Sequence, residues 1–464
     1  MYQYKGMEDT IAAIATPSGQ GGIGIIRISG NDAVAVVDRV LRLQANKTLA
    51  KAKSHTVHHG WVVGKNKEIV DEVLATLMKA PKSYTAEDVV EISCHGGMTV
   101  LNEVLQTVLT AGARLAAPGE FTKRAFLHGR MDLTQAEAVI DVIQAKTEIF
   151  LRQSQHQLKG ELSTQLDLIR DELIKLYTML EAVINFPEDG IDAQNRRQIS
   201  ERLEAQYKDI VKLLESSASG RILKDGIRIV ICGKPNVGKS SLLNALLKEQ
   251  RAIVTPIAGT TRDVLEESAQ IKGIPISLVD TAGILEPRDL IEEEAIKRSH
   301  LYIKGADMVL LVLDHSCVLE EQDLRLIEQL KFARVLVVVN KIDLAGKIDM
   351  AHARKVFGPA NVIEISALDQ RSIQNLEEKI VGMICRQKDL DTNGILISNV
   401  RHIKALEAAQ EDLQSACRLM IENTPLEFIS EEIKSAVNEL DAITGRNIDD
   451  DLLESIFSQF CIGK

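Results

Sequence analysis

The chain has 464 residues, enough for about three domains, and its 45% hydrophobic and 26% charged residues are typical of a globular protein. Its net charge of −11 argues against nucleic-acid binding over the whole surface, so we expect no DNA partner and only a local patch for any RNA. No run of about 18 apolar residues occurs, and none of the six cysteines forms a CxxC pair. We therefore predict no membrane span, no zinc site and a reduced, cytoplasmic protein.

The first 120 residues alternate short β-rich runs with turns and predict a small α/β domain. Strands are expected at Ile23–Ser29 and Val89–Ser93. Helices are expected at Asn31–Leu43, with Asn31 near the N-cap, and at Val100–Thr110.

A long helical segment follows. Leucine, isoleucine and valine recur every three or four residues from Leu158 to Val183, which is the stripe of a bundle helix. The segment Phe186–Gly190 breaks this helix, and a second helix is predicted from Asp192 to Ser216. The serine-rich run Ser216–Gly220 is typical of a linker.

From Gly226 to about Arg386, apolar strands alternate with helices and predict a doubly wound, mainly parallel sheet. The expected strands are Ile227–Cys232, Ile276–Val279, Met308–Leu313, Val335–Val339 and Val362–Ile365. Helices return at Val400–Glu422, Pro425–Thr444 and Asp449–Phe457. The helical material on both sides would pack as one domain with the α/β unit inserted, which gives boundaries of 1–120, 121–222, 223–386 and 387–464.

The segment Gly233–Ser240 matches the phosphate-binding pattern GxxxxGK[ST] between a strand and a helix. Its glycines let backbone N–H groups face the phosphates, and the helix N-terminus adds positive potential. Lys239 would reach the β- and γ-phosphates, and Ser240 would bind Mg²⁺. The further nucleotide contacts expected here are Asn236, Val237, Gly238 and Ser241.

Two further motifs each end a predicted strand, Ile276–Val279 and Val335–Val339. Asp-Thr-Ala-Gly would bind the Mg²⁺ hydration shell and the γ-phosphate, and Asn-Lys-Ile-Asp would bind the base. Asp343 selects guanine, because a carboxylate accepts hydrogen bonds from both N1–H and the exocyclic amino group. The predicted contacts are Asp280, Thr281, Ala282, Gly283, Asn340, Lys341 and Asp343, with Ser366 and Ala367 facing the guanine oxygen.

A switch segment, Ile257–Asp263, lies between these motifs, and Thr261 is predicted to complete the Mg²⁺ coordination. Position 284, where small regulatory GTPases carry a water-orienting glutamine, holds Ile284, so water must be positioned otherwise. Glu292 is one candidate, although a solvated helix start explains its acidic run equally well on sequence alone.

These motifs and both ends of the chain resemble the bacterial tRNA modification GTPases of the MnmE (TrmE) family over essentially the full length. The other segments that carry the resemblance are Gly21–Gly30, Pro118–Phe121 and the terminal run Phe460–Lys464. The resemblance implies a Ras-like GTPase domain inserted in a helical domain, after an N-terminal tetrahydrofolate-binding domain. It implies a homodimer that forms a heterotetramer with FAD-dependent MnmG. The implied reaction adds a carboxymethylaminomethyl group at C5 of the wobble uridine in certain tRNAs.

The resemblance also assigns residues. K⁺ would be bound by Asn236, Thr255, Ile257 and Thr260, and a one-carbon tetrahydrofolate by Arg27, Glu91, Arg130 and Lys464. Glu292 and Cys461 match the family's catalytic acidic residue and C-terminal cysteine, with Lys239 as the third catalytic residue. The GTP contacts would extend over Thr255, Pro256, Ile257, Ala258, Gly259, Thr260 and Thr261.

The residues alone support other interpretations at some of these sites. Arg27 on a strand is more often part of a surface ion pair than of a ligand site. Cys461 is as well explained as a spectator thiol as by a reactive thiolate near Lys464. A GTP-switched assembly scaffold, acting on ribosomes or a protein partner, would carry the same GTPase motifs.

Overall fold

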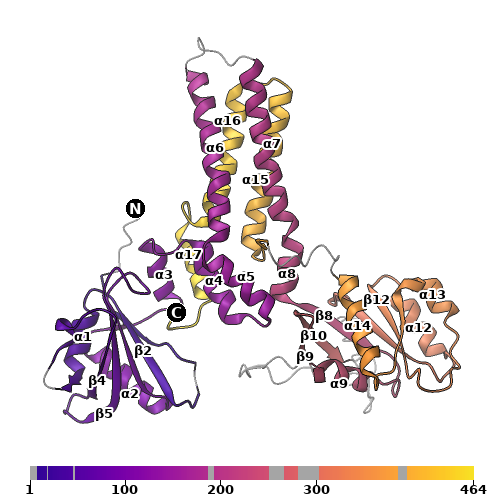
Figure 1. Ribbon diagram of the computed structural model, residues 1–464, viewed down its shortest axis with the longest axis horizontal. Helices are drawn as coiled ribbons and strands as arrows, with labels where there is room; N and C mark the ends of the chain where they lie inside the picture. The colour runs from indigo at the N-terminus through magenta and orange to yellow at the C-terminus, as the bar shows by residue number, and fades with distance from the viewer. Residues whose placement is uncertain are drawn as a thin grey trace. The chain divides into compact units, whose positions relative to one another are not determined.

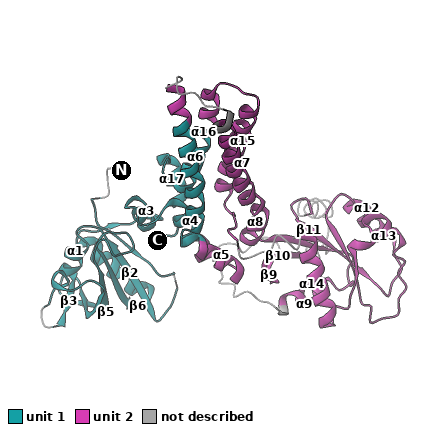
Figure 2. Ribbon diagram, turned by 45° about the horizontal axis from the view of Figure 1, so that its top comes forward, with its two compact units in different colours: residues 1–140, 157–179, 433–464 teal, residues 141–156, 180–432 magenta. Residues whose placement is uncertain are grey.

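The computed structural model describes residues 8–17, 19–44, 47–185, 193–249, 266–280, 303–384 and 394–464 (Figure 1). It divides into two compact units, coloured separately in Figure 2. Unit 1 comprises Met1–Ile140, Gln157–Met179 and Ile433–Lys464. Unit 2 comprises Asp141–His156 and Leu180–Glu432. Distant parts of the sequence thus share each unit.

Unit 1 contains a seven-stranded sheet in the order β3-β4-β5-β6-β2-β1-β7. Its strands are β1 Ile11–Ile14, β2 Ile23–Ser29, β3 Leu41–Leu43, β4 Thr56–Val63, β5 Ile69–Met78, β6 Val89–His95 and β7 Arg114–Leu115. Helices α1 Ala33–Val40 and α2 Met98–Thr110 bury one face of this sheet, and a short 3₁₀ turn, Leu49–Lys51, joins the same core. The antiparallel register places Arg27 opposite Glu91.

The helix predicted at Asn31–Leu43 is wrong at its C-terminal end. It stops at Val40, and Leu41–Leu43 forms strand β3 against β4. Leu41 and Leu43 are buried on either side of an exposed Arg42, which is the two-residue period of a strand. Pairing with β4 therefore overrides local helix propensity at these residues.

Helix α3 Glu120–Leu127 packs against β1 of the sheet, and the C-terminal helix packs against α3. Phe121, on α3, is fully buried with Ile11 and Ala13 of β1. Phe457, at the end of α17 Asp450–Ser458, packs with Phe126 of α3. The C-terminal helix thereby packs against α3, which itself packs against the N-terminal sheet.

The long helices pair between distant parts of the sequence. They are α4 Leu133–Gln144, α5 Glu148–Leu158, α6 Glu161–Asn185, α7 Ala193–Glu215, α8 Ser217–Asp225, α15 Val400–Ile421 and α16 Leu426–Thr444. Within unit 1, Arg170 of α6 forms an ion pair with Asp441 of α16. Within unit 2, Ser430 of α16 donates a hydrogen bond to Glu181 of α6 at 2.5 Å, and α7 packs along α15. None of the described helices is both long and apolar enough to cross a membrane.

The linker predicted at Ser216–Gly220 is wrong, because these residues enter helix α8. Gly220 is buried, and a Cβ there would lie 2.3 Å from the carbonyl oxygen of Ile397. Close packing against another segment, rather than flexibility, explains the small residues.

Unit 2 contains the predicted doubly wound sheet, in the order β13-β12-β11-β8-β10-β9. Its strands are β8 Ile227–Cys232, β9 Glu266–Ile271, β10 Ile274–Asp280, β11 Met308–Asp314, β12 Val335–Asn340 and β13 Val362–Glu364. All neighbouring pairs are parallel except β9 with β10. Helices α9 Lys239–Glu249 and α14 Gln370–Ile384 cover one face, whereas α12 Glu321–Leu330 and α13 Ala351–Phe357 cover the other. A 3₁₀ turn, Pro359–Asn361, precedes β13.

The multidomain α/β and α fold class is confirmed by this arrangement. Strand order reverses at β8, which has β10 on one side and β11 on the other. In open parallel sheets, ligands bind beyond the carboxyl ends of the strands at such a switch point. The segment that begins at Gly233 leaves the sheet there.

Candidate functional site

The loop between β8 and α9 has the backbone shape of an anion cradle. Asn236 and Gly238 have φ angles of 66° and 98°, so successive N–H groups turn toward one side. A Cβ on Gly238 would lie 2.3 Å from the Asn340 side-chain nitrogen, so both the conformation and the space require glycine. Ser240 and Ser241 follow in the first turn of α9, where the helix dipole favours a phosphate.

Lys239 holds a positive charge inside this loop. Its side chain is buried, with 5% of its surface exposed, and its Nζ donates to the carbonyl oxygens of Gly233 at 2.8 Å and Lys234 at 2.7 Å. Lys234 in turn pairs with Asp323 at 2.5 Å and Glu320 at 3.0 Å at the start of α12. Lys239 thus closes the loop on its own carbonyl oxygens, and Lys234 holds the loop to the start of α12.

Asn340, the last residue of β12, joins three segments of the site. Its Nδ2 donates to the Val237 carbonyl oxygen at 3.0 Å, and its Oδ1 accepts from the Ala367 N–H at 3.0 Å. The side chain is only 2% exposed. The phosphate loop and the segment after β13 are therefore held against the same strand end.

Lys341 and Asp343 complete the side of the site predicted to bind the base. Lys341 has a φ of 67°, and its Nζ donates to the Asn236 carbonyl oxygen at 2.7 Å and to Asp314 at 2.6 Å. Burial disfavours the Asp314 carboxylate, but hydrogen bonds from Lys341 and Ser316 hold its pKa below the usual range.

A residue in the segment that follows β13 orients the carboxylate of Asp343. Ser366 donates a hydrogen bond to Asp343 Oδ1 at 2.6 Å. Asp343 is exposed, so the rest of its carboxylate faces solvent at the strand ends. This geometry leaves Asp343 able to accept donors from a ligand edge.

Several predicted site residues lie outside the described part of the chain. They are Thr255, Pro256, Ile257, Ala258, Gly259, Thr260, Thr261, Thr281, Ala282, Gly283 and Glu292. Asp280 is described in its backbone only, which pairs with Ile231 of β8 and so ends beside the phosphate loop.

The sequence reasoning missed Asp314. The signal was available, because Asp314 ends β11 at the same sheet edge as Asp280 and Asn340 end their strands. It was overlooked because no nucleotide motif contains it.

A second cluster forms on the sheet of unit 1. Arg27 Nε donates to Glu91 at 2.8 Å, so the ion pair favoured from the residues alone is present. Arg27 also donates to the carbonyl oxygen of Gly463 at 3.3 Å. Its side chain is 15% exposed and that of Glu91 is 24% exposed, so the pair borders solvent.

Arg130 and Lys464 lie in the same cluster. The guanidinium carbon of Arg130 lies 5.0 Å from the Tyr84 ring centroid, and that of Arg27 lies at the same distance from it. Burial, and next the positive charge of Arg27, lower the pKa of Lys464. The structure therefore brings together all four residues assigned to folate: Arg27, Glu91, Arg130 and Lys464.

Backbone contacts attach the terminal segment to this cluster. The N–H of Phe121 donates to the Lys464 carbonyl oxygen at 3.2 Å. Gly463 has a φ of 96°, and a Cβ there would lie 2.3 Å from the Ile14 carbonyl oxygen. Cys461, in the same segment, is exposed.

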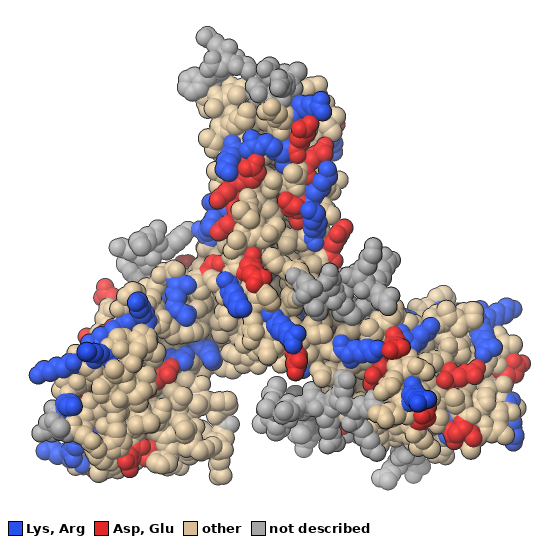
Figure 3. All heavy atoms as spheres, viewed as in Figure 1, with Lys and Arg blue, Asp and Glu red and all other residues tan. Residues whose placement is uncertain are grey.

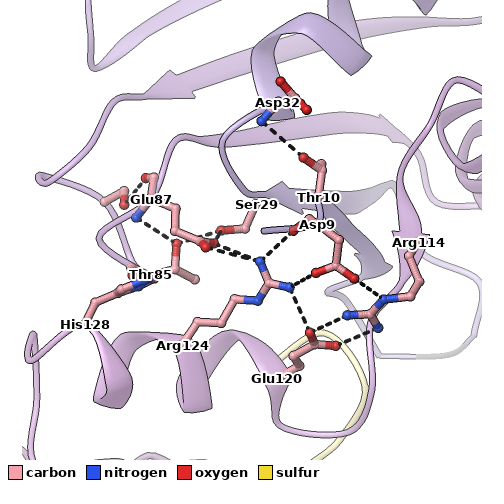
Figure 4. A network of polar contacts seen from close by, with 11 residues as sticks. Asp9, Thr10, Ser29, Asp32, Thr85, Glu87, Arg114, Glu120, Arg124 and His128 are labelled. Carbon is pink, nitrogen blue, oxygen red and sulfur yellow. Dashed lines mark hydrogen bonds and ion pairs between the residues drawn. The ribbon is translucent and has the colours of Figure 1, made fainter. Parts of the chain in front are cut away.

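A charge network centred on the buried Arg124 holds α3 (Figure 4). Arg124 is 1% exposed and pairs with Asp9 at 2.7 Å, Glu120 at 2.9 Å and Glu87 at 3.1 Å. Arg114 joins Asp9 and Glu120 at 2.6 and 2.7 Å. The network was not predicted, since its members are scattered along the sequence and match no motif.

Comparison with known proteins gives matches along the whole chain. Residues 10–130 match the family model described as GTP-binding protein TrmE N-terminus, and residues 133–461 match the MnmE helical domain. The tRNA modification GTPase MnmE of Desulforamulus reducens is 45% identical over 460 residues, covering 99% of this chain and 100% of the relative. That of Carboxydothermus hydrogenoformans gives the same identity and coverage.

Among solved structures, the G domain of the T. maritima FeoB iron transporter is 34% identical. The match covers 34% of this chain and 99% of that one, with a TM-score of 0.26.

Proposed function

The chain belongs to the family of tRNA modification GTPases named MnmE, and from this premise we propose which reaction its two sites serve. It is a GTP hydrolase that takes part in tRNA modification. The proposed reaction adds a carboxymethylaminomethyl group at C5 of the wobble uridine in certain tRNAs, together with a FAD-dependent MnmG partner. The observation that carries this proposal is the convergence of Arg27, Glu91, Arg130 and Lys464 in a chain that also holds a GTP site.

GTP binding would use the described loop and strand ends directly. The N–H groups around Asn236 and Gly238 and the ammonium of Lys239 face the phosphates, while Asp343 accepts both donors of the guanine edge. Ser240 and Thr261 would hold Mg²⁺, which neutralises phosphate charge when bound. The fit rests on the loop geometry and on Ser240 at the helix start.

Potassium would bind beside this loop. Asn236 would provide its side chain, and Thr255, Ile257 and Thr260 their carbonyl oxygens. The backbone of Asn236 is left-handed, and Lys341 binds its carbonyl oxygen. These two features fix the position from which the Asn236 side chain extends, which supports this role. Such a cation supplies charge that an arginine finger supplies in other GTPases. Glu292 would position the attacking water.

The cluster on unit 1 would bind a one-carbon tetrahydrofolate. Glu91 accepts from Arg27 through Oε1, and its other oxygen can accept from the amino-pterin edge. Arg27, Arg130 and Lys464 bring three cationic side chains to the cluster against the one carboxylate of Glu91, which suits the glutamate carboxylates of folate. Cys461 lies within the same terminal segment and is exposed.

A homodimer would use the sheet face of unit 1 that α1 and α2 do not cover. Pairing registers place Val57, Leu74 and Ile23 on this face, where they are 60%, 47% and 68% exposed. Large exposed apolar residues on one face are typical of an interaction surface. Arg27 and Glu91 share the face, so the folate cluster would border the dimer contact.

The tRNA and MnmG would bind local surfaces of a cytoplasmic complex. On the face shown in Figure 3, Lys and Arg side chains are interspersed with Asp and Glu over the long helices. This distribution, with the net charge of −11, supports a confined contact with tRNA.

Mass spectrometry of wobble uridines tests the proposal. Cells lacking this chain should lose the C5 modification, and the wild-type chain should restore it. A Lys239→Ala chain should fail to restore it, because the phosphate charge is no longer matched. Intact modification in the deletion strain would refute the tRNA assignment.

A further inference from the structure

One aromatic ring contacts two of the cationic residues of the folate cluster. Tyr84 is half-buried, and the guanidinium carbons of Arg27 and Arg130 both lie 5.0 Å from its ring centroid. Both distances are within the range of about 6 Å in which a ring quadrupole attracts a cation. The two guanidinium groups, whose like charges repel, are thus both attracted to the neutral ring of Tyr84.

A hydrogen bond and apolar packing fix the ring itself. The Tyr84 hydroxyl hydrogen-bonds Thr122 Oγ1 at 2.8 Å, and Thr122 is fully buried on α3. Tyr84 also packs against both apolar clusters around α3, one with Phe121 and one with Phe457. Its position is therefore set by the same helix whose Phe121 N–H binds the terminal segment.

We propose that Tyr84 is a positioning residue of the folate pocket, which holds Arg27 and Arg130 together in a ligand-ready arrangement. The inference rests on the proposed folate site. Arg27 is partly neutralised by Glu91, whereas Arg130 is exposed and is ordered here by the ring. A pocket formed in advance avoids the entropy cost of fixing a long arginine side chain when the ligand binds.

The test measures tetrahydrofolate affinity of the full chain by anaerobic calorimetry. Tyr84→Phe keeps the ring face and loses only the hydroxyl, so affinity should stay within about threefold of wild type. Tyr84→Leu removes the quadrupole and should weaken binding about tenfold. Tyr207→Leu, a half-buried tyrosine on α7, is the matched control and should leave affinity unchanged.

A trifluorinated phenylalanine at position 84 covers the case in which Tyr84→Leu does not fold. Fluorination keeps the shape of the ring and removes its negative face, so binding should weaken relative to Tyr84→Phe while the melting temperature stays the same. Equal affinities of these two variants would overturn the positioning role.

Arg27→Ala distinguishes failure of the proposed folate site from failure of the role assigned to Tyr84. If wild type binds folate and Arg27→Ala does not, the pocket stands and the Tyr84 variants decide the inference. If wild type itself fails to bind tetrahydrofolate, the proposed folate site is wrong and the role of Tyr84 falls with it.

Discussion

The side-chain amide of Asn340 donates a hydrogen bond to the main-chain carbonyl oxygen of Val237 at 3.0 Å. The other half of the same amide accepts from the N–H of Ala367. One buried side chain thereby joins the phosphate loop to both segments predicted to surround guanine. Displacement of any one of these segments disturbs the other two.

Asn340→Leu should destabilise the GTPase sheet and weaken nucleotide binding together. The change leaves the Val237 carbonyl and the Ala367 N–H without their partner, at about 1–3 kcal/mol each. Urea denaturation and titration with fluorescent GDP measure the two effects. Asn244→Leu, at an exposed position of α9, is the control and should stay within about 0.5 kcal/mol of wild type. Equal stabilities of the two variants would contradict the role of Asn340.

Asp343→Asn should change base preference from guanine toward xanthine. An amide offers one donor and one acceptor, which match the N–H and the carbonyl of xanthine in place of the two donors of guanine. Competition binding with GTP, XTP and ATP measures the change. Ser366→Ala is a milder control, because it removes only the hydrogen bond that orients the carboxylate. Unaltered guanine preference in Asp343→Asn would exclude this residue from the base site.

GTP hydrolysis should be much faster in KCl than in NaCl at equal ionic strength. A K⁺ ion held by Asn236 would stabilise charge that develops on the phosphates. Phosphate release assays should show the difference in wild type and its loss in Asn236→Ala. If both salts give the same rate in wild type, the cation assignment is wrong.

Acid should loosen the network around Arg124. The hydrogen bond from Arg114 is the largest cause that lowers the pKa of Asp9 below 3.8. Burial opposes ionisation of Glu120, but bonds from Arg114, Ala117 and Arg124 still bring its pKa below 4.5. Both carboxylates therefore stabilise the folded chain above these values, and the contribution is lost as pH falls through the lowered pKa values.

Urea midpoints measured from about pH 6 down to about pH 3 should follow this loss. Arg114→Met should flatten the dependence, since it removes a partner shared by both carboxylates. Arg325→Met, which breaks an exposed pair within α12, should leave the slope unchanged. A steep acid transition in Arg114→Met equal to that of wild type would exclude this origin.

The nucleotide site could be predicted because its residues are close together in the sequence. Sites formed by residues far apart in the sequence could not be predicted in this way. A strand, a glycine loop and a helix start are consecutive in sequence, so Gly233–Ser240 could be placed directly. The four residues assigned to folate were identified only through the resemblance, because no spacing links Arg27 to Lys464. Tyr84 and Arg124 were missed for the same reason. Arg124 meets Asp9 across 115 positions, and no periodicity records such a pair.

The bond between Arg27 and Gly463 joins residues 436 positions apart. A ribosome releases the first strands of the sheet long before it reaches position 463, and N-terminal segments generally fold first during synthesis. The sheet of unit 1 is therefore able to form before Gly463 reaches Arg27. A chain released early would lack the Gly463 carbonyl oxygen and Lys464, so the proposed folate site would be incomplete in it.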